Sequence, residues 1–311
     1  MKIIHKWLIG ILAALAAALL AGVFFQVKVT LDMRKEVSAM KTQKKSLELD
    51  IKKEEESLVL EQVMSEEEDK EQGGAEQEEE AAEAAGGEAA QNDMTAEGNG
   101  KKVAIDPGHQ GYHIDMSELE PVGPDSQEMK AKATQGTEGR FTGIPEYELN
   151  LTISKQLAEE LQKRGYEVML TRQDNDTAIS NRERALLAAD FGADIYLRIH
   201  ANGSENPDDS GALTMAPSAE NPYIAQLHDK SYALGEAVIN AYCQSCGLSN
   251  RGVMLADNMS GTNWSKVPVI ILEMGFMTNQ SDDTKMQNAE FQVQMVQGIA
   301  NGIDQYFAAG N

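Results

Sequence analysis

Apolar strand-like runs alternate with helical patterns from residue 101 onward, and this alternation limits the fold more than any other feature of the chain. The expected strands cover 101–106, 166–172, 193–202, 211–216 and 267–276, and the expected helices cover 147–165, 179–192, 222–245 and 289–307. Strands that alternate with helices predict an α/β fold. We expect residues 101–311 to form a single domain, with a mostly parallel or mixed sheet flanked by helices on both faces.

A second feature is the uncharged apolar run at residues 7–26, which has about the length of a helix that spans a bilayer. Lys2 and Lys6 precede it, as in a secretory signal, but the run is longer than the usual apolar core of a signal peptide. We expect residues 1–26 to be an uncleaved transmembrane anchor, with a removed signal peptide as the alternative. The domain then lies outside the cell, either held on the membrane by a single span or secreted.

The segment between this run and the domain divides in two by composition. Residues 27–53 carry mixed charges and a short heptad-like spacing of apolar side chains, which predicts a charged helical stalk. Residues 54–99 hold 17 acidic residues and one lysine and supply most of the formal net charge of −23. Such a tract buries too little apolar surface to fold and repels itself, so we expect 54–100 to be a disordered acidic linker.

The acidic composition also limits the partners and cofactors of the chain. The sequence contains no basic patch, P-loop or dinucleotide fingerprint, which argues against nucleic acid as a partner. The two cysteines, Cys243 and Cys246, form one C-x-x-C near the end of a helical pattern. Since a single pair is weak support for zinc, we expect buried thiols or a small-loop disulfide. No pattern indicates an oligomeric state.

Three chemically competent side chains stand where apolar strands of the expected sheet end. They are His109, His200 and Glu273. In open α/β sheets, ligands bind at the carboxyl ends of the strands. We therefore expect these three side chains to converge at one edge of the sheet.

Two histidines and one carboxylate with an open fourth position form a common catalytic zinc site. Glu146 is the best third ligand, because it opens a helix after a 36-residue loop, 110–145, that can fold back over the sheet. Glu148 competes with it from the same helical turn. His113 is less suited, because the residues between it and His109 include glycine and are expected to form a loop. We expect one Zn²⁺ ion.

A zinc hydrolase also needs a group that takes a proton from water and delivers it to the leaving amine. Glu273 fits this role, because a buried strand otherwise has no reason to end in an acid. Burial would raise the pKa of this carboxyl, and the zinc cation would oppose that rise. We expect Glu273 to be the general acid/base.

Six motifs in a fixed order connect these residues to a known family. Within residues 102–283 they read "VAIDPGHQG", "PEYELNL", "GYEVMLTR", "NRERALLAA", "ADIYLRIHANGS" and "VPVIILEMGFMTNQSD". Together they resemble the zinc-dependent N-acetylmuramoyl-L-alanine amidases of the amidase-3 type, over residues 101–308. The resemblance implies peptidoglycan as the partner, and cleavage of the amide between the lactyl group of N-acetylmuramic acid and the L-alanine of the stem peptide.

The resemblance also implies a role for each candidate residue. The zinc-binding His of the family's G-H-x-G turn falls on His109, and that of its I-H-A-N motif falls on His200. The zinc-binding Glu of the E-x-x-x-N-L motif falls on Glu146, which decides against Glu148. The Glu of the E-x-G-F segment, the family's general acid/base, falls on Glu273.

The chain departs from the family pattern at two places. Where the family often has Ser before I-H-A-N, this chain has Arg198, which shares a strand face with His200. We expect Arg198 and Asn202 to contact the substrate, and Asp106 to support the ligands from behind. The loop 110–145 is longer than the family's compact form, and we expect it to be a substrate wall, a regulatory flap or a cover.

Two other functions compete with the amidase. Another zinc peptidase or amidohydrolase would use the same site, and its products would differ. A catalytically inactive peptidoglycan-binding module that recruits other hydrolases would lack a ligand or the acid, yet all four positions are filled. The sequence therefore favours an amidase in the cell wall space, tethered by 1–26 and spaced from the membrane by 54–100.

Overall fold

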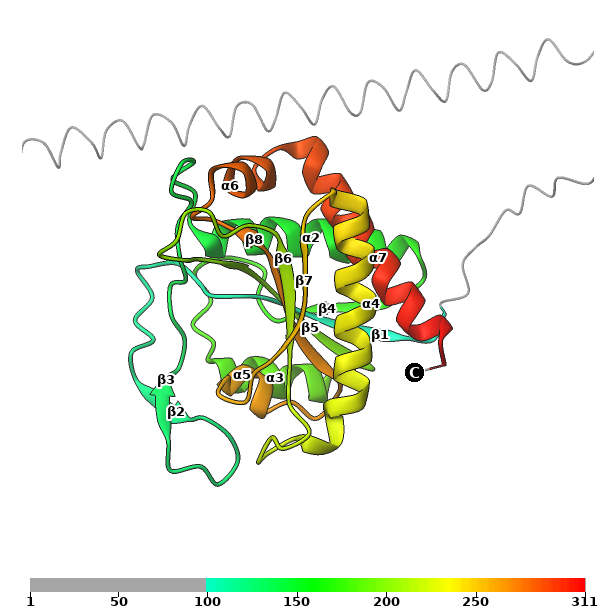
Figure 1. The fold of residues 1–311 in the computed structure, drawn as a ribbon. Coiled ribbons are helices and arrows are strands. Elements are labelled where there is room, and N and C mark those ends of the chain that lie inside the picture. Colours follow the sequence, from blue (N-terminus) through cyan, green and yellow to red (C-terminus); the bar gives the residue numbers. More distant parts are fainter. Residues whose placement is uncertain (1–98, 311) are drawn as a thin grey trace, which may run out of the picture. The chain divides into compact units, whose positions relative to one another are not determined.

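The computed structural model describes residues 99–310, which fold as one α/β domain (Figure 1). The expected anchor 1–26, the stalk 27–53 and all but the end of the linker 54–100 lie outside the described residues. Within 99–310, no helix is long and apolar enough to cross a bilayer.

The centre of the domain is a six-stranded mixed sheet. Its strands are β1 (Lys102–Pro107), β4 (Glu167–Leu170), β5 (Ile195–Asn202), β6 (Ala212–Ala216), β7 (Asn250–Leu255) and β8 (Val269–Phe276). Across the sheet they follow the order β4-β1-β5-β8-β6-β7. The first four are parallel, while β6 pairs antiparallel with β8 and parallel with β7. The predicted mixed sheet is confirmed.

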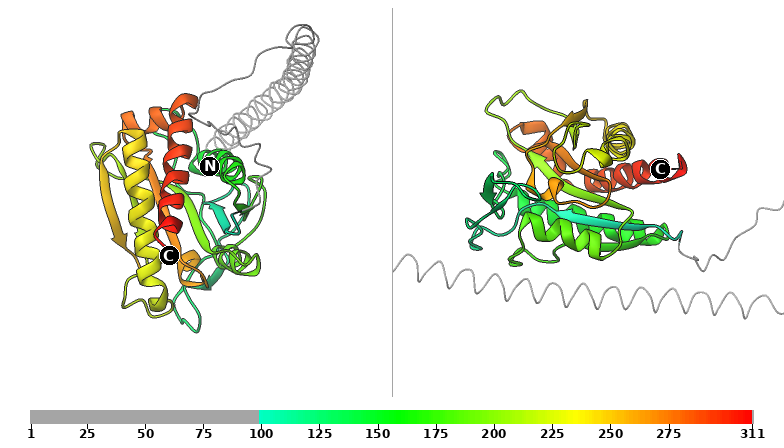
Figure 2. Two further views of the ribbon diagram at one scale, coloured as in Figure 1. Left: turned by 90° about the vertical axis from the view of Figure 1, so that its right-hand side faces the viewer. Right: turned by 90° about the horizontal axis from the view of Figure 1, so that it is seen from below.

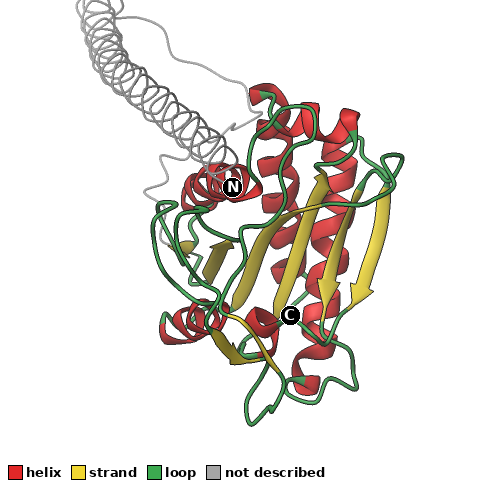
Figure 3. Cartoon of the chain, turned by 90° about the vertical axis from the view of Figure 1, so that its left-hand side faces the viewer, coloured by secondary structure: helices red, strands yellow, loops and turns green. Residues whose placement is uncertain are grey.

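Helices cover both faces of this sheet. They are α2 (Glu146–Lys163), α3 (Asn181–Asp190), the 3-10 turn η1 (Ala225–Leu227), α4 (His228–Cys246), α5 (Ser260–Asn263), α6 (Gln280–Met286) and α7 (Ala289–Ala308). Val103 and Ile105 of β1 belong to the larger core cluster with α2, α4 and α7, whereas Ala104 belongs to the smaller cluster with α3. Because successive strand residues point to opposite faces, these clusters lie on opposite sides of the sheet. Figure 2 shows α4 and α7 side by side, and Figure 3 shows the strands in front of helices.

The expected strands and helices are all present, and one helix begins later than expected. The helix predicted over 222–245 starts at His228, because the side chain of Asn221 accepts hydrogen bonds from the backbone of Tyr223 and Ile224 and holds a turn there. Ser180 caps α3 through a reciprocal capping box. The sequence pattern did not predict β7, α5, α6 and the hairpin of β2 (Leu119–Pro121) and β3 (Met129–Ala131), which are short or half-exposed.

The C-x-x-C pair lies buried at the end of α4 as two free thiols. Burial raises the pKa of Cys243 to about 11, and burial together with the neighbouring Cys243 raises the pKa of Cys246 to about 12. Protonated, buried thiols are inert. Of the two expected alternatives, buried thiols are confirmed.

Candidate metal centre

Three of the predicted site residues project from one face of the sheet, the face that α3 covers. Arg198, His200 and Glu273 alternate with core residues of β5 and β8, and His200 is the register partner of Glu273 on the neighbouring strand. As expected from the ranges 193–202 and 267–276, β5 continues past His200 to Asn202 and β8 continues past Glu273 to Phe276. On the opposite face of the sheet, the side chains of β5 and β8 remain buried as far as Ala201 and Met274. His200 and Glu273 thus stand on the sheet face close to the carboxyl ends of β5 and β8, near the edge where the sequence predicts the site.

His109 lies on the turn after β1 in the left-handed backbone region, with φ 62°. A non-glycine residue in this region is uncommon and persists where surrounding contacts hold it. The glycine before it is required by space, because a Cβ at Gly108 would collide with the His200 ring. The turn therefore brings the His109 ring edge-on to the His200 ring, with centroids 4.8 Å apart.

Three donor atoms meet at this point. His109 Nε2 lies 3.1 Å from Glu146 Oε1 and 3.1 Å from His200 Nδ1, and the latter two atoms are 3.2 Å apart. Glu146 is the first residue of α2 and is buried, whereas Glu148 is exposed and takes no part. The structure thus brings together the three residues that the sequence predicts as ligands.

Hydrogen bonds fix the orientation of two of these side chains. His109 Nδ1 donates to the carbonyl of Thr134 at 2.8 Å, which leaves the Nε2 lone pair directed at the cluster. The Glu146 carboxylate accepts hydrogen bonds from the backbone N–H of Thr137 at 2.9 Å and from Asn150 Nδ2 and the Ala201 N–H, each at 3.1 Å. Thr134 and Thr137 belong to the long loop 110–145, so this loop helps to build the cluster.

The protonation states also suit metal binding. Burial would raise the pKa of Glu146, but the adjacent His109 and His200 hold it well below its usual value. Burial lowers the pKa of His200 to about 4, although its hydrogen bond to Glu146 acts in the opposite direction. At neutral pH the cluster therefore offers a carboxylate and a neutral His200 imidazole, the forms that bind metals.

The donor set matches the geometry of zinc. Tetrahedral zinc with bonds of about 2.0–2.1 Å to nitrogen and oxygen separates neighbouring ligand atoms by about 3.3–3.4 Å. The three separations of 3.1–3.2 Å are close to this. Two imidazoles and one carboxylate leave a fourth position open, as catalytic zinc sites do. The residues present therefore fit one zinc ion.

Glu273 lines the same cavity as His109 and His200, in a space of about 430 Å³. Burial, and then the negative charge of Glu146, raise the pKa of Glu273 to about 8, while Arg198 opposes the rise. Its Oε2 is buried and has no hydrogen-bond partner among residues 99–310. A protonatable carboxyl without a partner is available for proton transfer beside the cluster.

Asp106 does not touch a ligand side chain. It is fully buried and accepts hydrogen bonds from Thr171 at 2.5 Å, Arg184 at 2.8 Å and Arg198 at 2.9 Å. Arg184 in turn donates to the backbone carbonyl of His109 at 3.0 Å. Asp106 thus acts on the turn that carries His109 through an arginine, and the sequence pattern did not predict that arginine.

The other predicted residues divide between cavity wall and surroundings. Arg198 lines the cavity, as do residues 130, 131, 133 and 134 of the long loop, which acts as a wall. Asn202 is not among the lining residues, and its side chain accepts a hydrogen bond from the Gly203 backbone N–H at 2.8 Å. Its contact with substrate stays a prediction.

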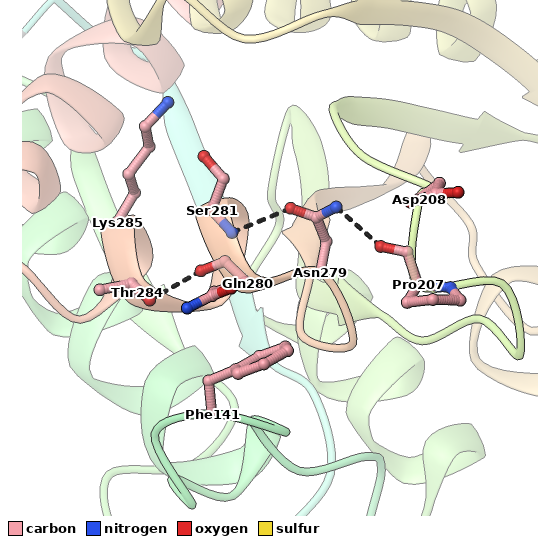
Figure 4. Close-up of a pocket in the computed structure, with 8 residues that line it drawn as sticks. All are labelled: Phe141, Pro207, Asp208, Asn279, Gln280, Ser281, Thr284 and Lys285. Carbon is pink, nitrogen blue, oxygen red and sulfur yellow. Dashed lines mark hydrogen bonds between the residues drawn. The ribbon is translucent and has the colours of Figure 1, made fainter.

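A second cavity of about 700 Å³ lies beyond the carboxyl ends of β5 and β8 (Figure 4). Phe141 and Lys285 line it together with the loop at Pro207 and the first residues of α6, where Asn279 Nδ2 donates to the Pro207 carbonyl at 2.8 Å. None of the three clustered donor residues lines it. No histidine lines it, so it does not offer the donor set of the metal cluster.

An α/β domain with a His, Glu, His donor cluster and an adjacent buried glutamate defines a hydrolase domain with a candidate metal centre. The chain belongs to the N-acetylmuramoyl-L-alanine amidase family, whose sequence profile matches residues 103–305. The resemblance inferred from the six motifs is confirmed.

The chain is similar in sequence to two bacterial proteins that are named as amidases. The chain is 32% identical over 165 residues to the N-acetylmuramoyl-L-alanine amidase LytC of Bacillus subtilis, covering 53% of this chain and 32% of that protein. It is 29% identical over 221 residues to the probable cell wall amidase LytH of Staphylococcus aureus, covering 70% of this chain and 63% of that protein. The chain thus spans less than two thirds of the length of these relatives.

Solved structures show the same fold. The N-acetylmuramoyl-L-alanine amidase of Clostridium difficile 630 is 28% identical with a TM-score of 0.56, over 68% of this chain and 98% of that one. The N-acetylmuramyl-L-alanine amidase of Mycobacterium smegmatis aligns over 68% of this chain and 98% of that one, with a TM-score of 0.62. At 21% identity, the latter shows the fold alone.

Proposed function

We propose that this chain is a zinc-dependent N-acetylmuramoyl-L-alanine amidase that releases stem peptides from peptidoglycan. The observation that carries the proposal is the cluster of His109, Glu146 and His200 with the unpartnered carboxyl of Glu273 beside it. One zinc ion held by the three clustered side chains would supply a Lewis acid and activate water at neutral pH.

The chain's own residues supply proton transfer and orientation. Glu273 accepts a proton from the attacking water and then delivers it to the nitrogen of the leaving L-alanine. Burial raises the pKa of this carboxyl to about 8 without metal, and a bound zinc ion would oppose that rise, which brings the pKa toward the neutral range that suits both halves of this role. Thr134 keeps the His109 ring in one tautomer, and Asn150 and Ala201 keep the Glu146 carboxylate in one orientation.

The site is further proposed to work outside the cell membrane. Residues 1–26 would anchor the chain as a single span, and the acidic segment 54–100 would let the domain reach into the wall. Intact mass measurement of the protein from membrane and medium fractions tests this. If the protein is found in the medium and begins after residue 26, then residues 1–26 are a removed signal peptide and not an anchor.

The decisive experiment treats purified peptidoglycan with the zinc-loaded chain, with and without chelator, and identifies the released peptides by mass spectrometry. An amidase releases intact stem peptides that begin with L-alanine, and chelator stops the release. Cleavage inside the peptide would identify a peptidase, and binding without release would identify an inactive module.

Variants separate the two roles within the site. Glu273→Gln is expected to keep one zinc per chain and to lose turnover by roughly 10²- to 10⁴-fold. His200→Ala is expected to lose the zinc itself. High residual turnover in Glu273→Gln, or full metal content in His200→Ala, contradicts the assigned role.

A further inference from the structure

The cavity beside the metal cluster gathers two cationic side chains in a chain whose formal net charge is −23. Lys130 of β3 and Arg198 of β5 both line it, together with His200 and Glu273. Lys130 Nζ donates one hydrogen bond, to the Asn258 carbonyl at 2.6 Å, and an ammonium group has three donors. Both cations therefore keep donor capacity toward the cavity.

Arg198 is held rigidly and is only 4% exposed. Its Nε donates to Asp106 at 2.9 Å and its Nη2 to Asn181 Oδ1 at 2.8 Å, and the Tyr196 hydroxyl also interacts with the guanidinium. A guanidinium has five N–H donors, so these partners do not use them all. The backbone of Gly261 lies against the guanidinium, because a Cβ there would lie 2.6 Å from Nη1. A fixed guanidinium with a donor left over is suited to bind a planar anion.

The charges behind the cavity do not balance. Arg184 and Arg198 share a single carboxylate, that of Asp106, and all three side chains are at most 5% exposed. The nearby Arg172 is also buried, and its hydrogen bonds go to backbone carbonyls and Asn175. Buried charges are normally paired. The Glu273 carboxyl, which lines the same cavity, offsets part of the charge of Arg198, and an anion in the cavity would complete this network.

The position of Arg198 indicates which part of a substrate this anion belongs to. Arg198 is two residues before His200 on the same strand face, so about 7 Å separates the two positions along β5. About two extended peptide residues span the same distance. In the proposed substrate, the carboxyl of the lactyl group is consumed in the scissile amide, so the sugar side near the bond is uncharged. A carboxylate at this distance must lie on the peptide side.

We propose that Arg198 and Lys130 bind a free carboxylate of the stem peptide, within about two residues of the scissile bond, and make the enzyme selective for acidic over amidated stems. This selectivity rests on the proposed amidase function. The carboxylate is expected to add charge-assisted hydrogen bonds to a desolvated site, where each contributes more than a neutral bond.

The test uses two soluble N-acetylmuramoyl-L-alanyl peptides that differ only in the second peptide residue, which carries a free carboxylate in one and a carboxamide in the other. The wild-type zinc enzyme is expected to show a kcat/KM about tenfold to a hundredfold higher for the acidic substrate. Arg198→Gln and Lys130→Gln are each expected to reduce this ratio toward one. Lys285→Gln, the same change in the second cavity, is expected to keep the wild-type ratio.

Several outcomes overturn the proposal. A wild-type ratio near one refutes it, and so does an unchanged ratio in both Arg198→Gln and Lys130→Gln. Should Arg198→Gln not fold, because the buried side chain loses its hydrogen bonds to Asp106 and Asn181, the ratio of Lys130→Gln decides. Should the wild type cleave neither substrate, calorimetric binding separates the two proposals. Tighter binding of the acidic peptide then keeps the recognition site while the amidase function fails, and equal binding overturns the site as well.

Discussion

Gly136 is a glycine of the long loop on which the metal cluster depends. Its φ is +79°, and a Cβ added there would collide with Glu146 Oε2 and lie 2.7 Å from Cδ2 of the His109 ring. Ordinary van der Waals contact begins at about 3.4 Å, so the ring must move by roughly 0.7 Å to accommodate Gly136→Ala. Metal–ligand distances tolerate about 0.2 Å. The variant therefore displaces two of the three ligands beyond that tolerance.

The expected loss of zinc affinity is at least tenfold to a hundredfold, the range seen when groups that orient metal ligands are changed. The left-handed backbone adds a stability cost of about 1–2 kcal/mol for any residue with a Cβ. Gly143→Ala is the matched control, because Gly143 has φ +69° and nothing lies within 4 Å of its added Cβ. It carries the backbone cost without moving a ligand.

The assay measures the zinc dissociation constant of each variant by competition with a chromogenic chelator, and the free energy of unfolding by urea titration. Both variants are expected to lose stability without metal, Gly136→Ala the more because its Cβ also displaces two side chains, and only Gly136→Ala is expected to lose affinity. Equal zinc affinity in Gly136→Ala and Gly143→Ala would refute the reasoning that the clearance at Gly136 serves the ligands.

Asp106→Asn is expected to cost about 3–5 kcal/mol in urea unfolding at pH 7 by leaving buried guanidinium charge uncompensated. Burial would raise the pKa of Asp106, but Arg184 and Arg198 hold it far below its usual value, so the cost should shrink as the pH falls below about 4. The exposed Glu167→Gln should cost at most about 1 kcal/mol, and equal losses would contradict this. In the chelated protein, burial and the charge of Glu146 raise the pKa of Glu273 from 4.5 to about 8, so the wild type loses stability as the pH rises through that window. Glu273→Gln should therefore melt higher than wild type at pH 8 but not at pH 4.5, and a pH-independent difference in melting temperature would speak against it. Glu146→Gln should lose zinc by metal analysis while Glu148→Gln keeps it, and the reverse would reassign the ligand.

Much of the fold is readable from local patterns. The strand at 267–276 and the helix at 289–307 are long, strongly apolar and periodic, and the structure places both within two residues of those bounds. The edge strand β7 was missed because most of its side chains are exposed or half-buried and it contains Gly252 with φ +79°. The hairpin of β2 and β3 was missed because three-residue strands carry no period that a pattern can reveal.

The metal cluster was predicted more fully than its supports. His109, Glu146 and His200 belong to motifs of fixed spacing, so a chemical role could be read from residue type and position. Thr134 and Gly136 belong to none of the six motifs, and Arg184 lies in "NRERALLAA" but is of a residue type that indicates no metal ligand. They reach the cluster through a backbone carbonyl, a missing side chain and a long-range hydrogen bond, respectively. Contacts of this kind depend on the path of the loop, which the pattern of single residues does not encode.

The sequence by itself determined the order of the longer strands and helices, the identity of the donor residues and the family, because hydrophobic period and motif spacing are local properties. Tertiary structure alone decided that Thr134 of the long loop orients the His109 ring, since this hydrogen bond joins residues 25 positions apart along the chain. It also decided that Arg198 shares one carboxylate with Arg184. That unequal sharing leaves positive charge beside the metal cluster. It arises only when Arg184 and Arg198, which follow Asp106 by 78 and 92 positions along the chain, are buried together with it.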